Sequence, residues 1–273
     1  MSPSAVKCIP TTIIAAMTAT DRQPISAVLI TRNAAGQLAE CLASVAFCDE
    51  IIVVDSGSDD ATTEIAERHG ARVIQSEWRG FGPQKQFAVE QARNDWVLCI
   101  DADERVSEGL QQSIIAARSE PARGSPGAYR FARCNRFMGR YLKHGEGYPD
   151  WSLRLFDRRV ARWSDDAVHE KVVVSGTVGT LAGDLLHESA EWLETYLAKQ
   201  NRYSTLAANE ALARGKRATL AHLLVSPLLR FIKFYMLRLG LLDGLPGLVH
   251  ILVGCGASFA KYAKMLDLQR RDP

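Results

Sequence analysis

A short apolar stretch that runs directly into a cluster of carboxylates constrains this chain more than any other feature. Residues 96–100 read Trp-Val-Leu-Cys-Ile and are followed at once by Asp101, Asp103 and Glu104. A continuous apolar run of this length is typical of a strand buried on both faces, as in a parallel sheet covered by helices. The carboxylates then lie at the carboxyl end of the strand, where open α/β sheets bind their ligands.

The spacing of these carboxylates predicts a metal site. If the chain stays extended beyond residue 100, the side chains of Asp101 and Asp103 point the same way. Two such carboxylates repel each other unless a cation lies between them. Oxygen ligands suit a hard ion such as Mg²⁺ or Mn²⁺, which keeps part of its water shell and binds substrate phosphates. A solvated acidic turn that closes the strand is the alternative.

Strands and helices alternate through the first half of the chain, which predicts βαβ units and a mostly parallel sheet. Apolar, β-branched runs predict further strands at 25–30, 51–54 and 72–74, and apolar spacing predicts helices over 36–46, 61–69 and 83–93. Three strand ends then meet on one rim, at residues 31–33, 55–60 and 101–104. Such a rim can hold a nucleotide, with a carboxylate for the base or ribose and a metal for the phosphates.

Composition and the lack of certain motifs argue against several other classes of protein. The 273 residues, 47% apolar and 23% charged, suit a globular domain with appendages, and the net charge of +2 does not suggest a nucleic-acid binder. No G-x-G-x-x-G follows the first strand and no P-loop motif occurs. The six cysteines lack C-x-x-C spacing, which predicts reduced thiols in a cytosolic protein. Residues 1–24 make a poor signal peptide, so we expect a flexible leader.

Three motifs arrive in order within residues 25–105. They are Thr31 and Asn33 after the first strand, Val-Val-Asp-Ser-Gly-Ser-Asp over 53–59, and Asp-Ala-Asp over 101–103. This combination resembles the nucleotide half of the inverting family 2 glycosyltransferases with the GT-A fold. The resemblance implies a Rossmann-like α/β fold with a mixed, mostly parallel sheet flanked by helices. It also implies a UDP-sugar donor and a divalent metal, Mg²⁺ or Mn²⁺, on the diphosphate.

The same resemblance assigns roles to individual residues. In that family the carboxylate that matches Asp55 contacts the uracil, and the one that matches Asp103 binds the metal. The segment 80–86 is similar to the loop and helix start that close over the nucleotide, with an ordinary Gly/Pro turn as the alternative. The expected nucleotide-sugar site comprises Thr31, Asn33, Asp55, Ser56, Gly57, Asp59, Gln84, Lys85, Asp101, Ala102 and Asp103.

Motifs in the second half of the chain narrow the resemblance. Tyr-Pro-Asp-Trp at 148–151, Arg-Leu-Phe at 154–156 and Val-His-Glu at 168–170 are similar to bacterial lipopolysaccharide inner-core β-1,4-glucosyltransferases. The resemblance implies UDP-glucose as donor and a lipopolysaccharide-core or lipid-linked acceptor that ends in heptose. The Pro/Gly-rich segment 120–127 is expected to divide the catalytic domain (25–190) into a nucleotide-sugar half (25–120) and an acceptor half (128–190).

An inverting transfer requires a base that takes the proton from the acceptor hydroxyl. Glu170 is the first candidate, because it follows a short apolar segment and burial would suit a carboxylate to this task. Asp165 and Asp166 are its rivals, and an ion pair of Glu170 with Lys171 or Arg154 is the structural alternative.

Three further side chains are candidates for metal, phosphate or acceptor contacts. His187 could be a third metal ligand or a phosphate contact, or could be structural. His169 could orient Glu170 or contact the acceptor, and Arg154 could pair with an acceptor phosphate or with a carboxylate of the site. The basic, aromatic-bearing segment 133–144 could hold an anionic acceptor, with a solvated surface as the alternative.

Residues 191–273 form a C-terminal region that we expect to be helical. Residues 191–212 have the spacing of an amphipathic helix that packs on the catalytic domain. The segments 220–229, 231–242 and 245–260 are strongly apolar and punctuated by Lys and Arg, and no uninterrupted run reaches the roughly 20 residues of a spanning helix. We therefore expect helices that lie on an anionic membrane surface, which predicts a cytoplasmic protein, peripheral on the inner face of the cytoplasmic membrane. A helical cap on the core is the alternative.

Two other classes of protein share part of this pattern. A haloacid-dehalogenase-type phosphatase also has Asp-x-Asp after a strand, but on its first strand and with Thr or Val two residues beyond. Here two βα units come first, and Val106 is three residues beyond Asp103. A non-catalytic nucleotide-sugar binder would not need a candidate base such as Glu170.

Overall fold

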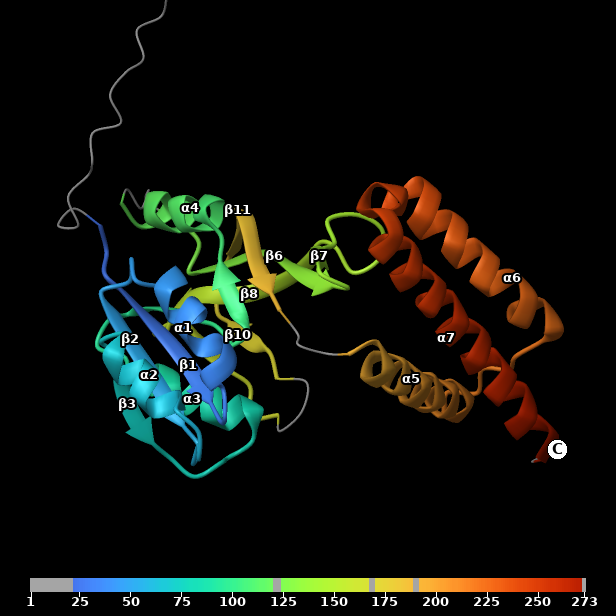
Figure 1. Cartoon of the computed structure of the whole chain (residues 1–273), viewed down its shortest axis with the longest axis horizontal. Helices are drawn as coiled ribbons and strands as arrows, with labels where there is room; N and C mark the ends of the chain where they lie inside the picture. Colours follow the sequence, from blue (N-terminus) through green and yellow to red (C-terminus); the bar gives the residue numbers. More distant parts are fainter. Residues whose placement is uncertain (1–21, 120–123, 167–169, 189–191, 272–273) are drawn as a thin grey trace, which may run out of the picture.

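The structure is a computed structural model that describes residues 22–119, 124–166, 170–188 and 192–271. The expected leader therefore lies almost wholly outside the described residues, as do His169 and part of the expected boundary at 120–127. An α/β domain forms one end of the molecule and a group of helices the other (Figure 1).

Within the described residues, nine strands form one mixed sheet in the order β3-β2-β1-β4-β8-β6-β11-β5, with β7 beside β6. The first four strands of this order are parallel, as predicted for the nucleotide half. Strand β8 is antiparallel to β4 and β6, so the acceptor half is mixed. A separate ribbon pairs β9 with β10. The strands are β1 Ile25–Thr31, β2 Glu50–Asp55, β3 Arg72–Gln75, β4 Trp96–Cys99, β5 Glu104–Val106, β6 Ala128–Phe137, β7 Arg140–Tyr141, β8 Asp150–Asp157, β9 Ala161–Trp163, β10 Val172–Val174 and β11 Val178–His187.

Helices cover both faces of the parallel strands, which explains why these strands are continuously apolar. Leu29 of β1 and Leu98 of β4 pack in the core cluster that includes Leu38 and Leu42. Val28 of β1 belongs to the cluster on the other side, with residues of α3 and β9. The helices of this domain are α1 Ala35–Ser44, α2 Thr62–Arg68, α3 Phe81–Glu90 and α4 Glu108–Ser119.

The chain does not stay extended after β4. Residues 101–104 form a turn, in which the backbone N–H of Glu104 donates to the carbonyl of Asp101 at 2.9 Å. The expectation that Asp101 and Asp103 point the same way is therefore wrong, because a turn separates their directions. The short strand β5 then pairs antiparallel with β11, with Glu104 opposite His187.

The C-terminal region is helical, as expected. It consists of α5 (Leu193–Ala213), α6 (Leu220–Phe231), a π-helical turn η1 (Ile232–Leu237), a 3₁₀ turn η2 (Gly240–Asp243) and α7 (Gly244–Arg271). Helix α5 buries Ala208 and Ala211 with Met265 of α7, so it packs chiefly on α7 and less on the catalytic domain than the sequence predicted. Buried Asp243 accepts hydrogen bonds from the backbone N–H groups of Lys143 and His144, which fixes the helices to the loop between β7 and β8.

Two segments of this region, Leu220–Leu237 and Gly240–Arg271, are long and apolar enough to cross a membrane by length and composition alone. Neither segment contains an uninterrupted apolar run of about 20 residues, as the sequence indicated, because charged residues interrupt both of them. A helix tolerates isolated Lys and Arg side chains that extend toward the interface.

Candidate active site

A cavity of about 660 Å³ opens at the carboxyl ends of β1 and β4; we call it the strand-end cavity. The nucleotide half contributes residues 30–34, 101–103, Lys85 and the half-exposed rings of Trp78 and Phe81. The acceptor half contributes Glu170 and His187. Residues expected to bind the donor, residues expected to bind the metal and the candidate base Glu170 thus line one cavity.

Asp55 does not line this cavity, but it contacts Thr31, which does. Its fully buried carboxylate accepts hydrogen bonds from the hydroxyl of Thr31 and the backbone N–H groups of Gly57 and Ser58. Asn33 has a φ of 52° and links the same loop, because its Oδ1 accepts from the backbone N–H of Asp59. Asp55 therefore holds the ends of β1 and β2 together, and its expected contact with uracil remains a prediction.

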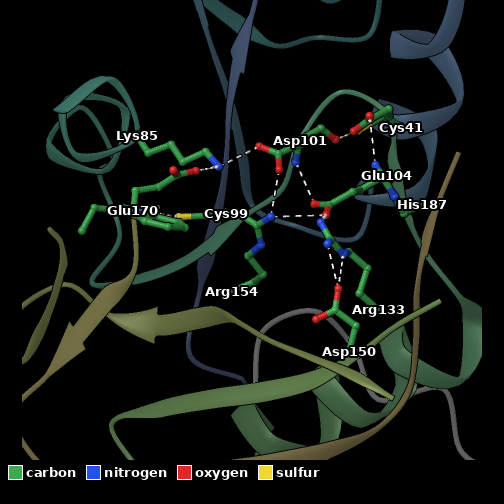
Figure 2. A network of polar contacts seen from close by, with 12 residues as sticks. Cys41, Lys85, Cys99, Asp101, Glu104, Arg133, Asp150, Arg154, Glu170 and His187 are labelled. Atoms are coloured by element: carbon green, nitrogen blue, oxygen red, sulfur yellow. Dashed lines mark hydrogen bonds and ion pairs between the residues drawn. The ribbon is translucent and has the colours of Figure 1, made fainter. Parts of the chain in front are cut away.

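Asp101 lies between two cations (Figure 2). Its Oδ1 is 3.1 Å from Nζ of Lys85, and its Oδ2 accepts from Nη2 of Arg154 at 2.8 Å. Burial acts to raise the pKa of Asp101, but the charges of Arg154 and Lys85 outweigh it and hold this pKa below its ordinary value. Of the two roles expected for Arg154, the pairing with a carboxylate of the site is confirmed.

Glu104 is a second anionic partner of Arg154. Its side chain is fully buried, with Oε1 3.3 Å from Nη2 of Arg154, while Oε2 accepts from the backbone N–H of Asp101. Burial raises the pKa of Glu104 above its ordinary value despite these cationic and amide partners. Arg133, which also pairs with Asp150, lies 3.6 Å from Glu104 and completes the network (Figure 2).

Asp103 and His187 are in contact on the lining of the strand-end cavity. Oδ2 of Asp103 is 3.1 Å from Nε2 of His187, and Nδ1 of His187 is 2.7 Å from Oδ1 of Asn135. An Nδ1–H that donates to Asn135 leaves the Nε2 lone pair directed at a carboxylate oxygen. A lone pair on Nε2 and the carboxylate of Asp103 are both acceptors, so a proton or a metal ion must lie between them. A histidine that binds a metal commonly donates a hydrogen bond from its other ring nitrogen, as Nδ1 can here to Asn135.

These two side chains fit a hard divalent ion that takes its remaining ligands from a diphosphate and water. Among the described residues there is no group of three or more His, Cys, Asp or Glu side chains arranged to hold a metal. Both carboxylate oxygens of Asp101 have cationic partners, so Asp103 and His187 are the better placed members of the expected metal set.

Glu170 lies on the other side of Asp101 from His187 (Figure 2). Its carboxylate accepts from Nζ of Lys85 at 2.9 Å, and its side chain is 19% exposed. The expected alternatives named Lys171 or Arg154 as its ion-pair partner, whereas the partner is Lys85. Of the rival bases, Asp165 is 78% exposed with Arg162 as its neighbour, and Asp166 is exposed and lies off the lining of the cavity.

Gly82 in the first turn of α3 leaves room for the chain that carries Asp166 and Glu170 to pack closely against this helix. A Cβ at residue 82 would lie 2.3 Å from the carbonyl oxygen of Ser164 and 2.7 Å from that of Asp166. We expect Gly82→Ala to displace this segment and to destabilise the fold by about 1–3 kcal/mol. Gly36→Ala, where a Cβ meets nothing within 4 Å, is the matched control. Equal urea unfolding midpoints of the two variants would contradict the expectation.

The other predicted residues fall into two groups. Ala102 and Asn33 line the cavity, whereas Ser56, Gly57, Asp59 and Gln84 lie off its lining. Fully buried Gln84 donates from Nε2 to the hydroxyl of Ser56. Sequence reasoning missed Trp78 and Gln37, whereas Phe81 lies in the segment 80–86 that was expected to close over the nucleotide. An exposed tryptophan beside this glycine loop is a recognisable signal.

The basic segment 133–144 is largely engaged with the protein itself. Arg140 donates to the carbonyl of Leu242, and Lys143 pairs with Asp184 at 3.0 Å. Arg136 pairs with Glu188 and is 43% exposed. Each of these three cations thus has a partner within the protein, and the expectation of a cationic acceptor surface stays a prediction.

Sequence comparisons identify the class of protein. The chain matches the model of the glycosyl transferase family 2 domain over residues 26–171. The chain therefore belongs to glycosyltransferase family 2.

Its relatives extend the match to most of the chain. It is 33% identical over 253 residues to the lipopolysaccharide core biosynthesis glycosyltransferase LpsC of Rhizobium meliloti (strain 1021), covering 89% of this chain and 92% of LpsC. It is 31% identical to the uncharacterized glycosyltransferase RP128 of Rickettsia prowazekii, over 89% of this chain and 87% of that protein. A solved structure, the mannosyltransferase PcManGT from Pyrobaculum calidifontis with GDP-Man and Mn²⁺, has a TM-score of 0.49 and 18% identity, covering 91% and 88% of the two chains. A similarity this distant says nothing of the donor or metal used here.

Proposed function

We propose that this glycosyltransferase moves a sugar, with glucose as the first candidate, from a UDP-sugar to a heptose of the lipopolysaccharide inner core, with inversion at the anomeric carbon. The observation that carries the proposal is the single cavity shared by the Asp103–His187 pair and Glu170. The near full-length relation to LpsC, named as a lipopolysaccharide core enzyme, supports the acceptor class. Another UDP-sugar with a polysaccharide, lipid-linked or protein acceptor is the alternative.

Each chemical requirement of the reaction then has a candidate group. Glu170 takes the proton of the acceptor hydroxyl, and the half-buried carboxylate is oriented by Lys85. Asp103 and His187 would hold a Mg²⁺ or Mn²⁺ ion, which neutralises the charge of the departing diphosphate. Lys85, with its side chain 8% exposed on the wall of the same cavity, supplies a fixed positive charge near that leaving group.

The first test is a donor screen. UDP-glucose, UDP-galactose and UDP-N-acetylglucosamine would each be supplied with truncated core lipopolysaccharide, with Mg²⁺, Mn²⁺ or EDTA. We expect transfer from one of the three, most readily UDP-glucose, and its loss in EDTA. A folded preparation that binds none of the three and hydrolyses none would exclude the proposed function.

Removal of the proposed metal ligand has a defined expected result. Asp103→Asn keeps the size of the side chain but removes its charge, so we expect at least about a hundredfold loss of metal-dependent UDP affinity and of kcat/KM. Isothermal titration with UDP and Mn²⁺ measures the first quantity. Asp267→Asn, at a 58% exposed aspartate of α7, is the matched control. Equal UDP affinity of Asp103→Asn and wild-type protein, with and without EDTA, would contradict the metal site.

We also propose that the C-terminal helices dock on the cytoplasmic face of the inner membrane, where a lipid-linked acceptor resides. Helix α6 buries none of its residues, and Leu224, Leu228 and Leu229 are about 60% exposed. Exposed Lys233 follows in η1 and suits an anionic surface, whereas Arg230 pairs with Glu146. Figure 1 shows α6 at the outer side of the molecule, away from the sheet.

Vesicle sedimentation tests this docking. We expect the protein to bind vesicles that contain phosphatidylglycerol at low salt, and Leu224→Glu with Leu228→Glu to reduce the bound fraction about tenfold or more, because both leucines lie on one face of α6. Val178→Glu, at a 43% exposed residue of β11, is the matched control. Wild-type protein that ignored these vesicles, or a control that lost binding equally, would refute the docking.

A further inference from the structure

A second cavity, of about 800 Å³, lies where the catalytic domain meets the helical region; we call it the junction cavity. Its wall includes Phe137 of β6, Trp192 and Tyr196 at the start of α5, and His250 of α7. In Figure 1 this is the region in which the β6–β7 hairpin reaches the C-terminal helices. Cavities between structural units are frequent ligand sites.

The junction cavity adjoins the strand-end cavity. Gln37 and His187 line both of them, and no other residue belongs to both linings among the described parts of the chain. A molecule in the junction cavity would therefore reach the strand-end cavity beside His187. The lining of the strand-end cavity also contains Glu170, the candidate base, so a substrate that extends from one cavity into the other enters the space that this carboxylate lines.

One wall of the junction cavity is aromatic. The rings of Phe137 and Tyr196 lie 5.1 Å apart at 60°, and His250 lies 5.2 Å from Phe137 and stacks on Tyr196. Trp192 is 82% exposed beside them. An aromatic face presents an apolar surface with a negative quadrupole, against which the polarised C–H groups of a sugar ring pack well.

The polar groups of this cavity offer both donors and acceptors. Arg136 donates to Glu188 at 2.9 Å, and the hydroxyl of Tyr141 donates to the same carboxylate at 2.8 Å. Glu188, Arg136 and Lys199 all line the cavity, so it offers a carboxylate as well as cations. Sugar hydroxyls are donors and acceptors at once and can pair with both kinds of group.

We propose that the junction cavity binds the acceptor saccharide, with a sugar ring on the aromatic wall and its hydroxyls at the Arg136–Glu188 pair. The assignment rests on the proposed transferase function and adds the acceptor subsite to it. In the reaction, an acceptor hydroxyl oxygen forms a bond to the anomeric carbon and its proton passes to the base. The bond from that carbon to the diphosphate breaks, and its electron pair leaves with UDP.

Acceptor kinetics with matched aromatic variants test this assignment. The probe is the deacylated oligosaccharide of truncated core lipopolysaccharide, used with the full chain so that no membrane contact contributes. Trp192→Ala removes an exposed ring of the cavity, and Trp151→Ala removes a 48% exposed ring of β8 that is not on its lining. We expect Trp192→Ala to raise the KM for the oligosaccharide about tenfold, with the KM for the UDP-sugar as internal reference. Arg136→Met is expected to act in the same direction.

A second readout does not depend on turnover. Titration of the oligosaccharide into UDP-saturated protein should show binding to wild type and to Trp151→Ala, and about tenfold weaker binding to Trp192→Ala. Unchanged acceptor KM and affinity in both Trp192→Ala and Arg136→Met would overturn the assignment, as would an equal effect of Trp151→Ala. If wild-type protein failed to bind UDP at all, the proposed function would fail instead, so the two failures are distinguishable.

Discussion

Replacement of Glu170 by glutamine is expected to slow sugar transfer by about 10²–10⁴-fold, the usual contribution of a positioned general base. Glutamine keeps the size of the side chain and its place beside Lys85, which is 2.9 Å from the wild-type carboxylate. The amide has no basic oxygen that could take the acceptor proton at neutral pH. The loss should therefore appear in kcat, while UDP affinity and the acceptor KM change little.

The same kinetics on Asp165→Asn and Asp166→Asn provide the comparison. Both aspartates are exposed and neither lines the strand-end cavity, so we expect each variant to keep at least about a third of wild-type activity, within the small effect usual for surface changes. Near wild-type transfer by Glu170→Gln, together with a large loss in one of the aspartate variants, would assign the base to that aspartate.

Arg154→Ala is expected to destabilise the fold by about 3–5 kcal/mol, because it leaves buried carboxylates without their shared cation. Arg154 is 7% exposed and contacts Asp101 at 2.8 Å and Glu104 at 3.3 Å. Urea unfolding measures this loss. Arg159→Ala, at a 64% exposed arginine that pairs with Asp157 and Asp95, is the control and should change the midpoint little.

The pH dependence of this variant has a defined sign. The pKa of Glu104 in the folded protein is raised by burial, so between its ordinary value and the folded value the folded state keeps a proton that the unfolded state has lost. The contribution of Glu104 to stability therefore falls as the pH rises through that interval. The charge of Arg154 lowers the pKa of Glu104, so the interval widens in Arg154→Ala. The double variant Arg154→Ala with Glu104→Gln should therefore be more stable than Arg154→Ala alone. No recovery would show that an unpaired Glu104 does not contribute to the loss.

Most of the nucleotide half was predictable because its signals are local. Continuous apolar runs gave β1, β2 and β4. Strand β5 was missed because three residues carry no periodicity of their own, and they are a strand only through pairing with β11.

The ion pairs of the site were only partly predictable for a similar reason. Asp101 meets Arg154, 53 residues away, and Glu170 meets Lys85, 85 residues away. Charge alone does not select such partners; the mixed sheet does, by setting β8 antiparallel beside β4. The Asp-x-Asp spacing likewise suggested two equivalent ligands, because nothing in the local sequence reveals that a turn directs one aspartate to cations and the other to His187.

The antiparallel pairing of β5 with β11 brings Asp103 and His187 together across 84 residues of chain. A fragment that stops before β11 would retain every motif recognised within residues 25–105 and still lack the imidazole. The proposed metal site therefore requires β11 to be paired with β5, so the two halves are not separable modules.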